Sequence, residues 1–204
     1  MTRIYLSGRL YDWFIEPLVG NIRQYVGRLV SEYELSPILD ICCGTATQTH
    51  ILNSKGYRAF GLDLSLQAVK YAVWKNPQVP VICADATQSP FKKASFKGIV
   101  LSFSLHDKSP AERNVIMVEA KRLLDPGGKM IFVDYECPWS RRSRLGAFPL
   151  YLIELTAGGA HFRNYRQFLK QGGLRSFIRM HDLIEVSRQD MAWRTVAVAV
   201  ARLP

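Results

Sequence analysis

The segment from Ser36 to Leu52, SPILDICCGTATQTHIL, constrains the fold of this chain more than any other feature of the sequence. Ile38 to Ile41 predict a short buried strand that carries an acid, Asp40, near its carboxyl end. The turn from Cys42 to Ala46 consists of small residues, so its backbone can approach a ligand closely. A strand, a tight turn and a helix in this order hold nucleotide-like cofactors in α/β proteins. The acid beside the turn argues against a phosphate as the ligand.

Strand-like and helix-like segments alternate from Ser36 to Asp134, which predicts a parallel sheet with helices on both faces. Apolar residues at helical spacing predict a helix within Tyr11 to Val30. Ser65 and Ser109 are expected to cap two further helices. Later strands are expected at residues 57–63, 79–84, 98–103, 129–134, 176–186 and 193–201. These segments predict an α/β fold with a doubly wound, seven-stranded sheet, mostly parallel with a late antiparallel strand.

The chain of 204 residues is 48% hydrophobic, which suits one domain with a substantial core. We expect a single domain throughout. Its parts are an N-terminal helical segment (1–35), a ligand-binding core (36–134), a helical cover (135–175) and terminal strands (176–204). The sequence shows no apolar run of membrane-spanning length, and its N-terminal residues are too polar for a signal peptide, so we expect a cytoplasmic protein.

The formal net charge of +10 indicates attraction to something acidic, such as nucleic acid or an anionic membrane. The charge is spread along the chain, which favours a solvated basic face, and no RNA-binding motif accompanies it, so we do not expect nucleic acid as a partner. Three arginines and an aromatic run between Trp139 and Ile153 suit peripheral contact with an anionic bilayer. A helix packed over the sheet is the favoured alternative.

The four cysteines are Cys42, Cys43, Cys83 and Cys137, and their spacing does not match that of a zinc site. We therefore expect packing cysteines, without disulfides and without a metal ion.

Two more acids stand where Asp40 does, at the carboxyl ends of predicted strands. Asp63 follows the small-residue turn by about 20 residues, a position from which a carboxylate can accept hydrogen bonds from both ribose hydroxyls. Asp85 ends the third strand, where it can accept a hydrogen bond from the amine of a base. Helix capping explains any one of these acids equally well. Three on the same edge of a parallel sheet favour a shared ligand.

Five motifs occur in an order that resembles a known protein family. They are LDICCGTA at 39–46, GLDLS at 61–65, ADA at 84–86, LSFSLH at 101–106 and EAKRLLDPGG at 119–128. Together they resemble the class I S-adenosylmethionine-dependent methyltransferases, which have a Rossmann-like fold, and most closely the branch that methylates ubiquinone and menaquinone precursors. The resemblance covers about Pro37 to Asp134.

The resemblance implies a binding role for particular residues. Asp40 and the turn with Cys42, Gly44 and Thr45 would hold the methionine end of S-adenosylmethionine, with the acid orienting its ammonium group. Asp63 would bind the ribose, with Leu64 beside it, while Asp85 and the backbone of Ala86 would bind the adenine. Ser102 would contact the methionine portion. The family commonly has glycine where Cys42 and Ala46 stand here, and an added β-carbon at Ala46 reduces affinity if that position needs a positive φ.

His106 is the candidate catalytic residue, because the loop after the fourth strand would face the methyl group. A methyl group on a sulfonium is already electrophilic, so a general base is needed only when the nucleophile must lose a proton. The alternative is a loop histidine that bonds to backbone. Asp107 could orient His106, although adjacent side chains often diverge. His161, Tyr165 and Tyr135 are weaker candidates for lining the acceptor pocket.

The sequence thus predicts a methyltransferase that converts S-adenosylmethionine to S-adenosylhomocysteine. Its acceptor would be small or lipophilic, and quinone-like by resemblance. The alternative is a non-catalytic module that binds S-adenosylmethionine or, through its basic charge, nucleic acid. A different dinucleotide enzyme is less favoured, because Asp40 and Cys42 stand where a pyrophosphate-binding turn needs an uncharged glycine run. Nothing in the sequence indicates the oligomeric state.

Overall fold

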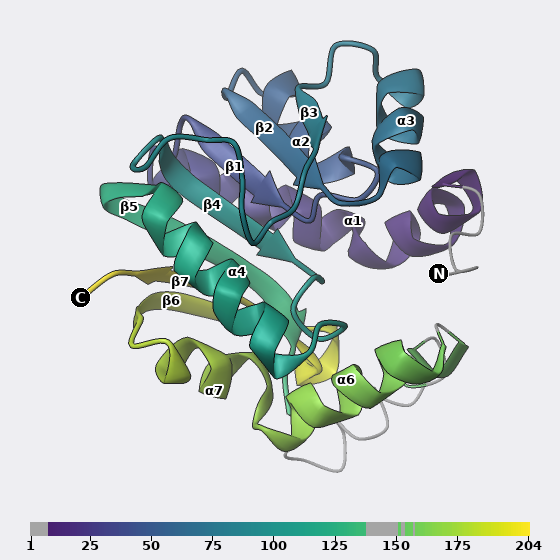
Figure 1. The fold of residues 1–204 in the computed structure, drawn as a ribbon, viewed down its shortest axis with the longest axis vertical. Coiled ribbons are helices and arrows are strands. Elements are labelled where there is room, and N and C mark those ends of the chain that lie inside the picture. The colour runs from purple at the N-terminus through teal and green to yellow at the C-terminus, as the bar shows by residue number, and fades with distance from the viewer. Residues whose placement is uncertain (1–7, 138–150, 152–153, 157) are drawn as a thin grey trace.

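The computed structural model describes residues 8–137, 151, 154–156 and 158–204, and Figure 1 shows their arrangement. Its helices and strands are, in chain order, α1 (Gly8–Glu32), β1 (Ile38–Ile41), α2 (Thr47–Ser54), β2 (Ala59–Asp63), α3 (Leu66–Lys75), β3 (Val81–Cys83), β4 (Phe96–Ser102), α4 (Pro110–Leu123), β5 (Leu124–Tyr135), α6 (Gly159–Lys170), α7 (Gly173–Met180), β6 (Ile184–Met191), the short 3₁₀ turn η1 (Ala192–Arg194) and β7 (Val196–Arg202).

The seven strands form one sheet in the order β3-β2-β1-β4-β5-β7-β6. The first five strands along the chain are parallel to one another, and β7 runs antiparallel to both β5 and β6. The predicted seven-stranded, mostly parallel sheet is confirmed. Strand order reverses between β1 and β4, and open α/β sheets bind ligands beyond the carboxyl ends of the strands at such a reversal.

Helices cover both faces of the sheet. In Figure 1, α4 lies in front of β4 and β5, whereas α1 passes behind the strands. Helix α6 lies beyond the carboxyl ends of the central strands, at the lower right of that view. The expected Ser109 capping box is present: Glu112 N–H donates to Ser109 Oγ at 3.3 Å, and Ser109 N–H donates to Glu112 Oε2 at 2.7 Å. Ser65 caps α3 through a single hydrogen bond, which its Oγ accepts from Ala68 N–H at 3.2 Å.

The core is continuous through the central strands. Ile38, Ile99, Phe132 and Val200 are all fully buried and belong to one apolar cluster. Strands covered on both faces need apolar side chains on both, which explains why β4 and β5 read as unbroken apolar runs.

The strand expected at residues 176–186 is wrong. Residues 173–180 form helix α7, and β6 begins only at Ile184. The apolar residues Leu174, Phe177 and Ile178 recur at helical spacing and are buried. Phe177 packs on Phe132 of β5, at 6.2 Å between ring centroids. Burial of this helical face outweighs the local strand-like pattern.

The segment expected to meet an anionic bilayer, Trp139 to Ile153, lies outside the described residues except for Tyr151. Among the helices that the structure describes, none has both the length and the apolar character needed to cross a bilayer.

Candidate functional site

The turn after β1 has an unusual backbone. Three of its residues lie in the left-handed region, with φ of 58° at Cys42, 56° at Gly44 and 54° at Ala46. Ala46 is also the residue that precedes α2. The positive φ on which the expectation for Ala46 depended is therefore present. Because this region costs an L-residue roughly 1 kcal/mol or more, the two non-glycine residues hold the turn under strain.

Asp63 ties this turn to the end of β2. Its Oδ2 accepts a hydrogen bond from Gly44 N–H at 2.7 Å, and its Oδ1 accepts one from Ser65 N–H at 2.8 Å. Each carboxylate oxygen can accept a second hydrogen bond. The structure thus brings Asp63 and Gly44 together, as a shared ligand site requires.

Asp40 lies deeper than the sequence suggests. Its carboxylate is buried and accepts a hydrogen bond from Thr49 Oγ1 at 2.8 Å. Burial is the main reason that the pKa of Asp40 is raised to about 6, with the neighbouring charge of Asp63 contributing, while Thr49 and Arg23 act in the opposite direction. Asp40 therefore lies on the interior side of the turn, in contact with α2.

Asp85 lies on the same edge but in a different environment. It follows β3, which pairs with β2 so that Asp63 lies opposite Cys83. Its side chain is exposed, and Oδ1 accepts hydrogen bonds from Thr87 N–H at 2.8 Å and Thr87 Oγ1 at 2.7 Å. These bonds lower the pKa of Asp85. The neighbouring Ala86 is buried, whereas Leu64, beside Asp63, is 70% exposed.

The cysteines differ from one another. All four are free, and burial raises the pKa of the Cys42 thiol to about 12 and that of Cys43 further. Cys83 and Cys137 are exposed, so the expected packing role is wrong for these two.

His106 lies just beyond β4 and is fixed by Asp134 at the end of β5. His106 Nδ1 lies 2.8 Å from Asp134 Oδ1. The backbone N–H groups of Leu105 and His106 donate to Asp134 Oδ2 at 3.0 and 3.3 Å. Asp107 instead contacts Lys108 Nζ at 2.7 Å, so the residue that orients His106 is Asp134 and not its sequence neighbour.

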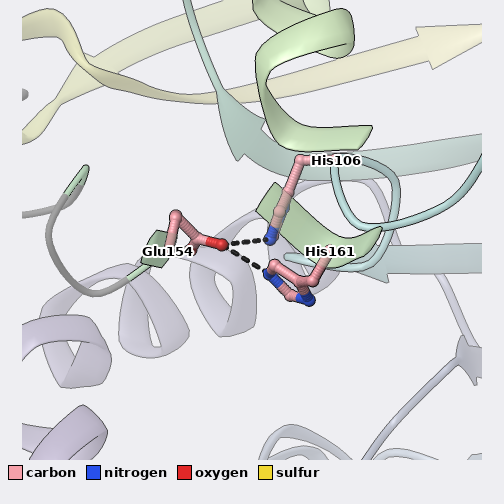
Figure 2. A group of neighbouring side chains, drawn as sticks. All are labelled: His106, Glu154 and His161. Atoms are coloured by element: carbon pink, nitrogen blue, oxygen red, sulfur yellow. Dashed lines mark hydrogen bonds and ion pairs between the residues drawn. The ribbon is translucent and has the colours of Figure 1, made fainter. Parts of the chain in front are cut away.

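Glu154 and His161 complete this group from the opposite side. Figure 2 shows one oxygen of the Glu154 carboxylate facing a nitrogen of each histidine ring. Glu154 Oε2 lies 3.6 Å from His106 Nε2 and 2.5 Å from His161 Nε2. Tyr135 Oη donates to the other oxygen of Glu154 at 2.6 Å. We call His106, Asp134, Tyr135, Glu154 and His161 the His–acid cluster.

The charges of the His–acid cluster favour a positive group at its centre. Burial disfavours the charged form of His106, but Asp134 and Glu154, with a smaller contribution from Asp107, outweigh it and raise the pKa of His106 to about 9. Contacts with His161, His106 and Tyr135 outweigh burial in lowering the pKa of Glu154.

Aromatic rings surround His106. The ring centroids of Tyr135, His161 and Tyr165 lie 4.7, 5.5 and 6.2 Å from that of His106. Phe103 packs on Tyr135 at 5.9 Å. The three residues suggested by sequence as lining an acceptor pocket are thus brought together around the candidate catalytic histidine.

Sequence reasoning missed four polar residues of this region. Asp134 and Glu154 belong to the His–acid cluster, and Thr49 binds Asp40. Ser104 Oγ is buried and has no hydrogen-bond partner within the described part of the chain. The signal that identified Asp40 and Asp63, an acid at the carboxyl end of a strand, applies equally to Asp134.

The core of the chain matches a known protein family. Residues 39–132 match the family described as a methyltransferase domain. An uncharacterised methyltransferase of Synechocystis sp. is 34% identical over 123 residues, which are 59% of this chain and 58% of that protein. The demethylmenaquinone methyltransferase of Renibacterium salmoninarum is 30% identical over 101 residues, or 50% and 42% of the two chains. The chain thus spans about half the length of the curated relatives it matches.

The fold extends the similarity beyond the matched core. The crystal structure of the N-methyltransferase NodS from Bradyrhizobium japonicum, in complex with S-adenosyl-L-homocysteine, has a TM-score of 0.62 at 19% identity and covers 94% of this chain and 91% of that one. At this identity, the comparison concerns the fold alone. Residues 39–132 thus match a methyltransferase domain, and the strand order and fold of the chain are similar to those of the class I S-adenosylmethionine-dependent methyltransferases.

Proposed function

We propose that this protein binds S-adenosylmethionine at the carboxyl ends of β1, β2 and β4 and catalyses methyl transfer to a small acceptor. The proposal that the protein binds S-adenosylmethionine is supported mainly by the hydrogen bond between Gly44 and Asp63. This bond holds Asp63, the candidate ribose-binding residue, next to the turn. The His–acid cluster carries the acceptor half. It lies beyond the next strand of the sheet, β4, and is held by β5.

The residues at the turn fit the cofactor. A β-carbon built on Gly44 would meet no other atom within 4 Å, so the space beside the turn is open. Asp63 can accept hydrogen bonds from the two ribose hydroxyls, and exposed Leu64 can pack on the adenine. Asp85 and the backbone of Ala86 would bind the adenine edge. Cys42 and Thr45 would line the methionine portion with Ser102, and buried Asp40 would favour its ammonium group electrostatically.

The bound cofactor would supply an electrophilic methyl group, so the protein has mainly to align a nucleophile and exclude water. The carboxylates of Asp134 and Glu154 raise the pKa of His106 and so favour its imidazolium form. We therefore assign His106 as a hydrogen-bond donor to an anionic acceptor oxygen, in place of the general base expected from sequence. Asp134 positions the ring for this contact.

The proposed acceptor is a planar, oxygen-bearing ring of the quinone class. Two observations support this choice. Tyr135, Tyr165 and Phe103 present aromatic surface next to His106, which suits a flat, partly apolar molecule. Several relatives that match this chain at about 30% identity are demethylmenaquinone methyltransferases.

Calorimetry with S-adenosylmethionine tests the cofactor half, and we expect a dissociation constant on the order of 10 µM. Incubation with radiolabelled cofactor and a reduced demethylmenaquinone tests the acceptor half, and label should enter the lipid phase. Binding without transfer to this quinol or to any compound of a cell extract would favour the non-catalytic module. No binding at about 1 mM cofactor would remove the whole proposal.

A further inference from the structure

We propose that His106, Glu154 and His161 form a binding site for a divalent transition-metal ion such as Zn²⁺. One ligand atom from each residue lies within 4.8 Å of the other two. The three residues come from different segments: the loop after β4, the helical residues 154–156 and helix α6. Figure 2 shows one nitrogen of each histidine facing the same oxygen of Glu154.

The distances suit an ion of this size. Neighbouring ligand atoms around tetrahedral zinc lie about 3.3 Å apart, given metal–ligand distances of about 2.0 to 2.1 Å. The 3.6 Å between His106 Nε2 and Glu154 Oε2 is close to that value and longer than a hydrogen bond. The 2.5 Å between Glu154 Oε2 and His161 Nε2 would lengthen by less than about 1 Å around an ion. The side chain of His161 is 29% exposed, which leaves it room to make this adjustment.

In His106 and Glu154, the polar atom that would not bind the ion already has a hydrogen-bond partner, as is usual for metal ligands. A metal-binding histidine generally donates its other ring N–H to a carboxylate, which fixes the ring orientation. His106 Nδ1 has this contact with Asp134, and Asp134 is itself held by the backbone N–H groups of Leu105 and Tyr135. The second oxygen of Glu154 accepts from Tyr135 Oη. The atoms that face inward are thus oriented by partners outside the group.

The donor set and the charge select the class of ion. Two imidazoles and one carboxylate suit Zn²⁺, Mn²⁺, Fe²⁺ or Co²⁺, whereas Mg²⁺ prefers oxygen ligands alone. The carboxylates of Asp134 and Glu154 have side chains 0% and 7% exposed, and a dication would offset two negative charges in this buried place.

Three protein ligands leave at least one position open, which is typical of catalytic rather than structural zinc sites. His106 Nε2 gives up its proton when the ion binds, so the ion would replace His106 as the partner of the acceptor oxygen and would lower the pKa of the acceptor's hydroxyl group. This role, though not the binding itself, rests on the proposed function.

Titration of chelator-treated protein with ZnCl₂ in a calorimeter tests the site. We expect one ion per chain with a dissociation constant below about 10 µM, and no heat with MgCl₂. His161→Gln should weaken Zn²⁺ binding at least tenfold, while His50→Gln, a histidine on α2 outside the cluster, should leave it unchanged. Thermal unfolding of both variants checks that they fold, and Glu154→Gln provides a second ligand variant.

Cobalt distinguishes this site from the cysteines. Bound Co²⁺ should give d–d bands without the intense thiolate-to-cobalt charge-transfer band that cysteine ligands produce. That charge-transfer band, unchanged affinity in His161→Gln, or absence of binding at about 100 µM Zn²⁺ would each overturn the proposal. S-adenosylmethionine binding is measured separately, so cofactor binding without zinc binding removes only the metal site. Zinc binding without cofactor binding removes only the proposed function.

Discussion

The carboxylate of Asp63 accepts a hydrogen bond from the backbone N–H of Gly44 at 2.7 Å, across 19 residues of sequence. This contact couples the end of β2 to the turn after β1. One side chain therefore both shapes the turn and offers its remaining acceptor capacity to a ligand.

We expect Asp63→Ala to weaken S-adenosylmethionine binding by roughly 2 to 3 kcal/mol, or about 30- to 150-fold, because paired hydrogen bonds to a charged group are lost. Calorimetry measures the change. Asp125→Ala, at the start of β5 and the opposite end of the strands, is the matched control and should bind as the unmodified protein does. A loss of less than threefold in Asp63→Ala would contradict the assigned role.

Asp40→Asn should stabilise the protein while weakening cofactor binding. The pKa of Asp40 is raised from 3.8 to about 6, so the folded state binds the proton more tightly than the unfolded state. This carboxyl therefore costs stability as the pH rises from about 4 to 6, by up to about 3 kcal/mol at pH 7. Asparagine avoids this cost, and its carbonyl can still accept from Thr49 Oγ1.

Urea unfolding at two pH values checks this prediction. The free energy of unfolding of Asp40→Asn should exceed that of the unmodified protein by on the order of 1 to 3 kcal/mol at pH 7. The difference should shrink as the pH falls and approach zero near about pH 3, where the aspartate is mostly protonated in both states. If Asp40→Asn is less stable than the unmodified protein at pH 7, ionised Asp40 does not destabilise the folded state.

Gly61→Ala should destabilise the protein by about 1 to 3 kcal/mol through overpacking. A β-carbon at Gly61 would lie 2.8 Å from Cys43 Sγ and 3.0 Å from Thr49 Oγ1, the hydroxyl that binds Asp40. Gly27→Ala is the contrast, because its β-carbon would meet only the flexible end of Lys55, at 3.1 Å. It lies within α1 and should stabilise the protein by about 0.5 to 1 kcal/mol. Thermal unfolding that moves both variants in the same direction would refute this packing argument.

Asp134→Asn should destabilise the protein by about 2 to 4 kcal/mol. Oδ1 of Asp134 contacts His106 Nδ1 and Tyr135 N–H, and Oδ2 accepts from the N–H groups of Leu105 and His106. Whichever way the asparagine amide is turned, its NH₂ group faces N–H donors. In Asp107→Asn only the contact with Lys108 is weakened, so we expect a change below about 0.5 kcal/mol. Equal effects of the two substitutions in urea unfolding would contradict the anchoring role of Asp134.

The position of the proposed cofactor-binding acids at one edge of the sheet was predictable because its signals are local. Asp40 and Asp63 each end a short apolar strand, and parallel pairing brings such ends to one edge of the sheet. Asp134 obeys the same rule at the end of β5, but its function depends on contact with a loop 28 residues earlier in the chain. The position of an acid at the end of a strand does not by itself predict the contact between Asp134 and His106.

The residues proposed to face the acceptor were harder to predict from the sequence, because their positions depend on tertiary packing. Glu154 and His161 belong to a cover whose position depends on tertiary packing, and no periodic pattern in 135–175 specifies which strand end the cover approaches. The same limit produced the error at α7. Eight residues with Leu174, Phe177 and Ile178 on one face form a helix here because that face packs on β5.

The order of these residues along the chain has an evolutionary consequence. The proposed cofactor contacts end at Ser102, whereas Glu154 and His161 arrive after the central strands are complete. Substitutions in α6 and the residues before it can therefore alter the chemistry presented to an acceptor without disturbing the turn, its acids or the strands that hold them. In a chain arranged this way, acceptor preference can change through substitutions in one contiguous segment, while the residues proposed to bind the cofactor stay the same.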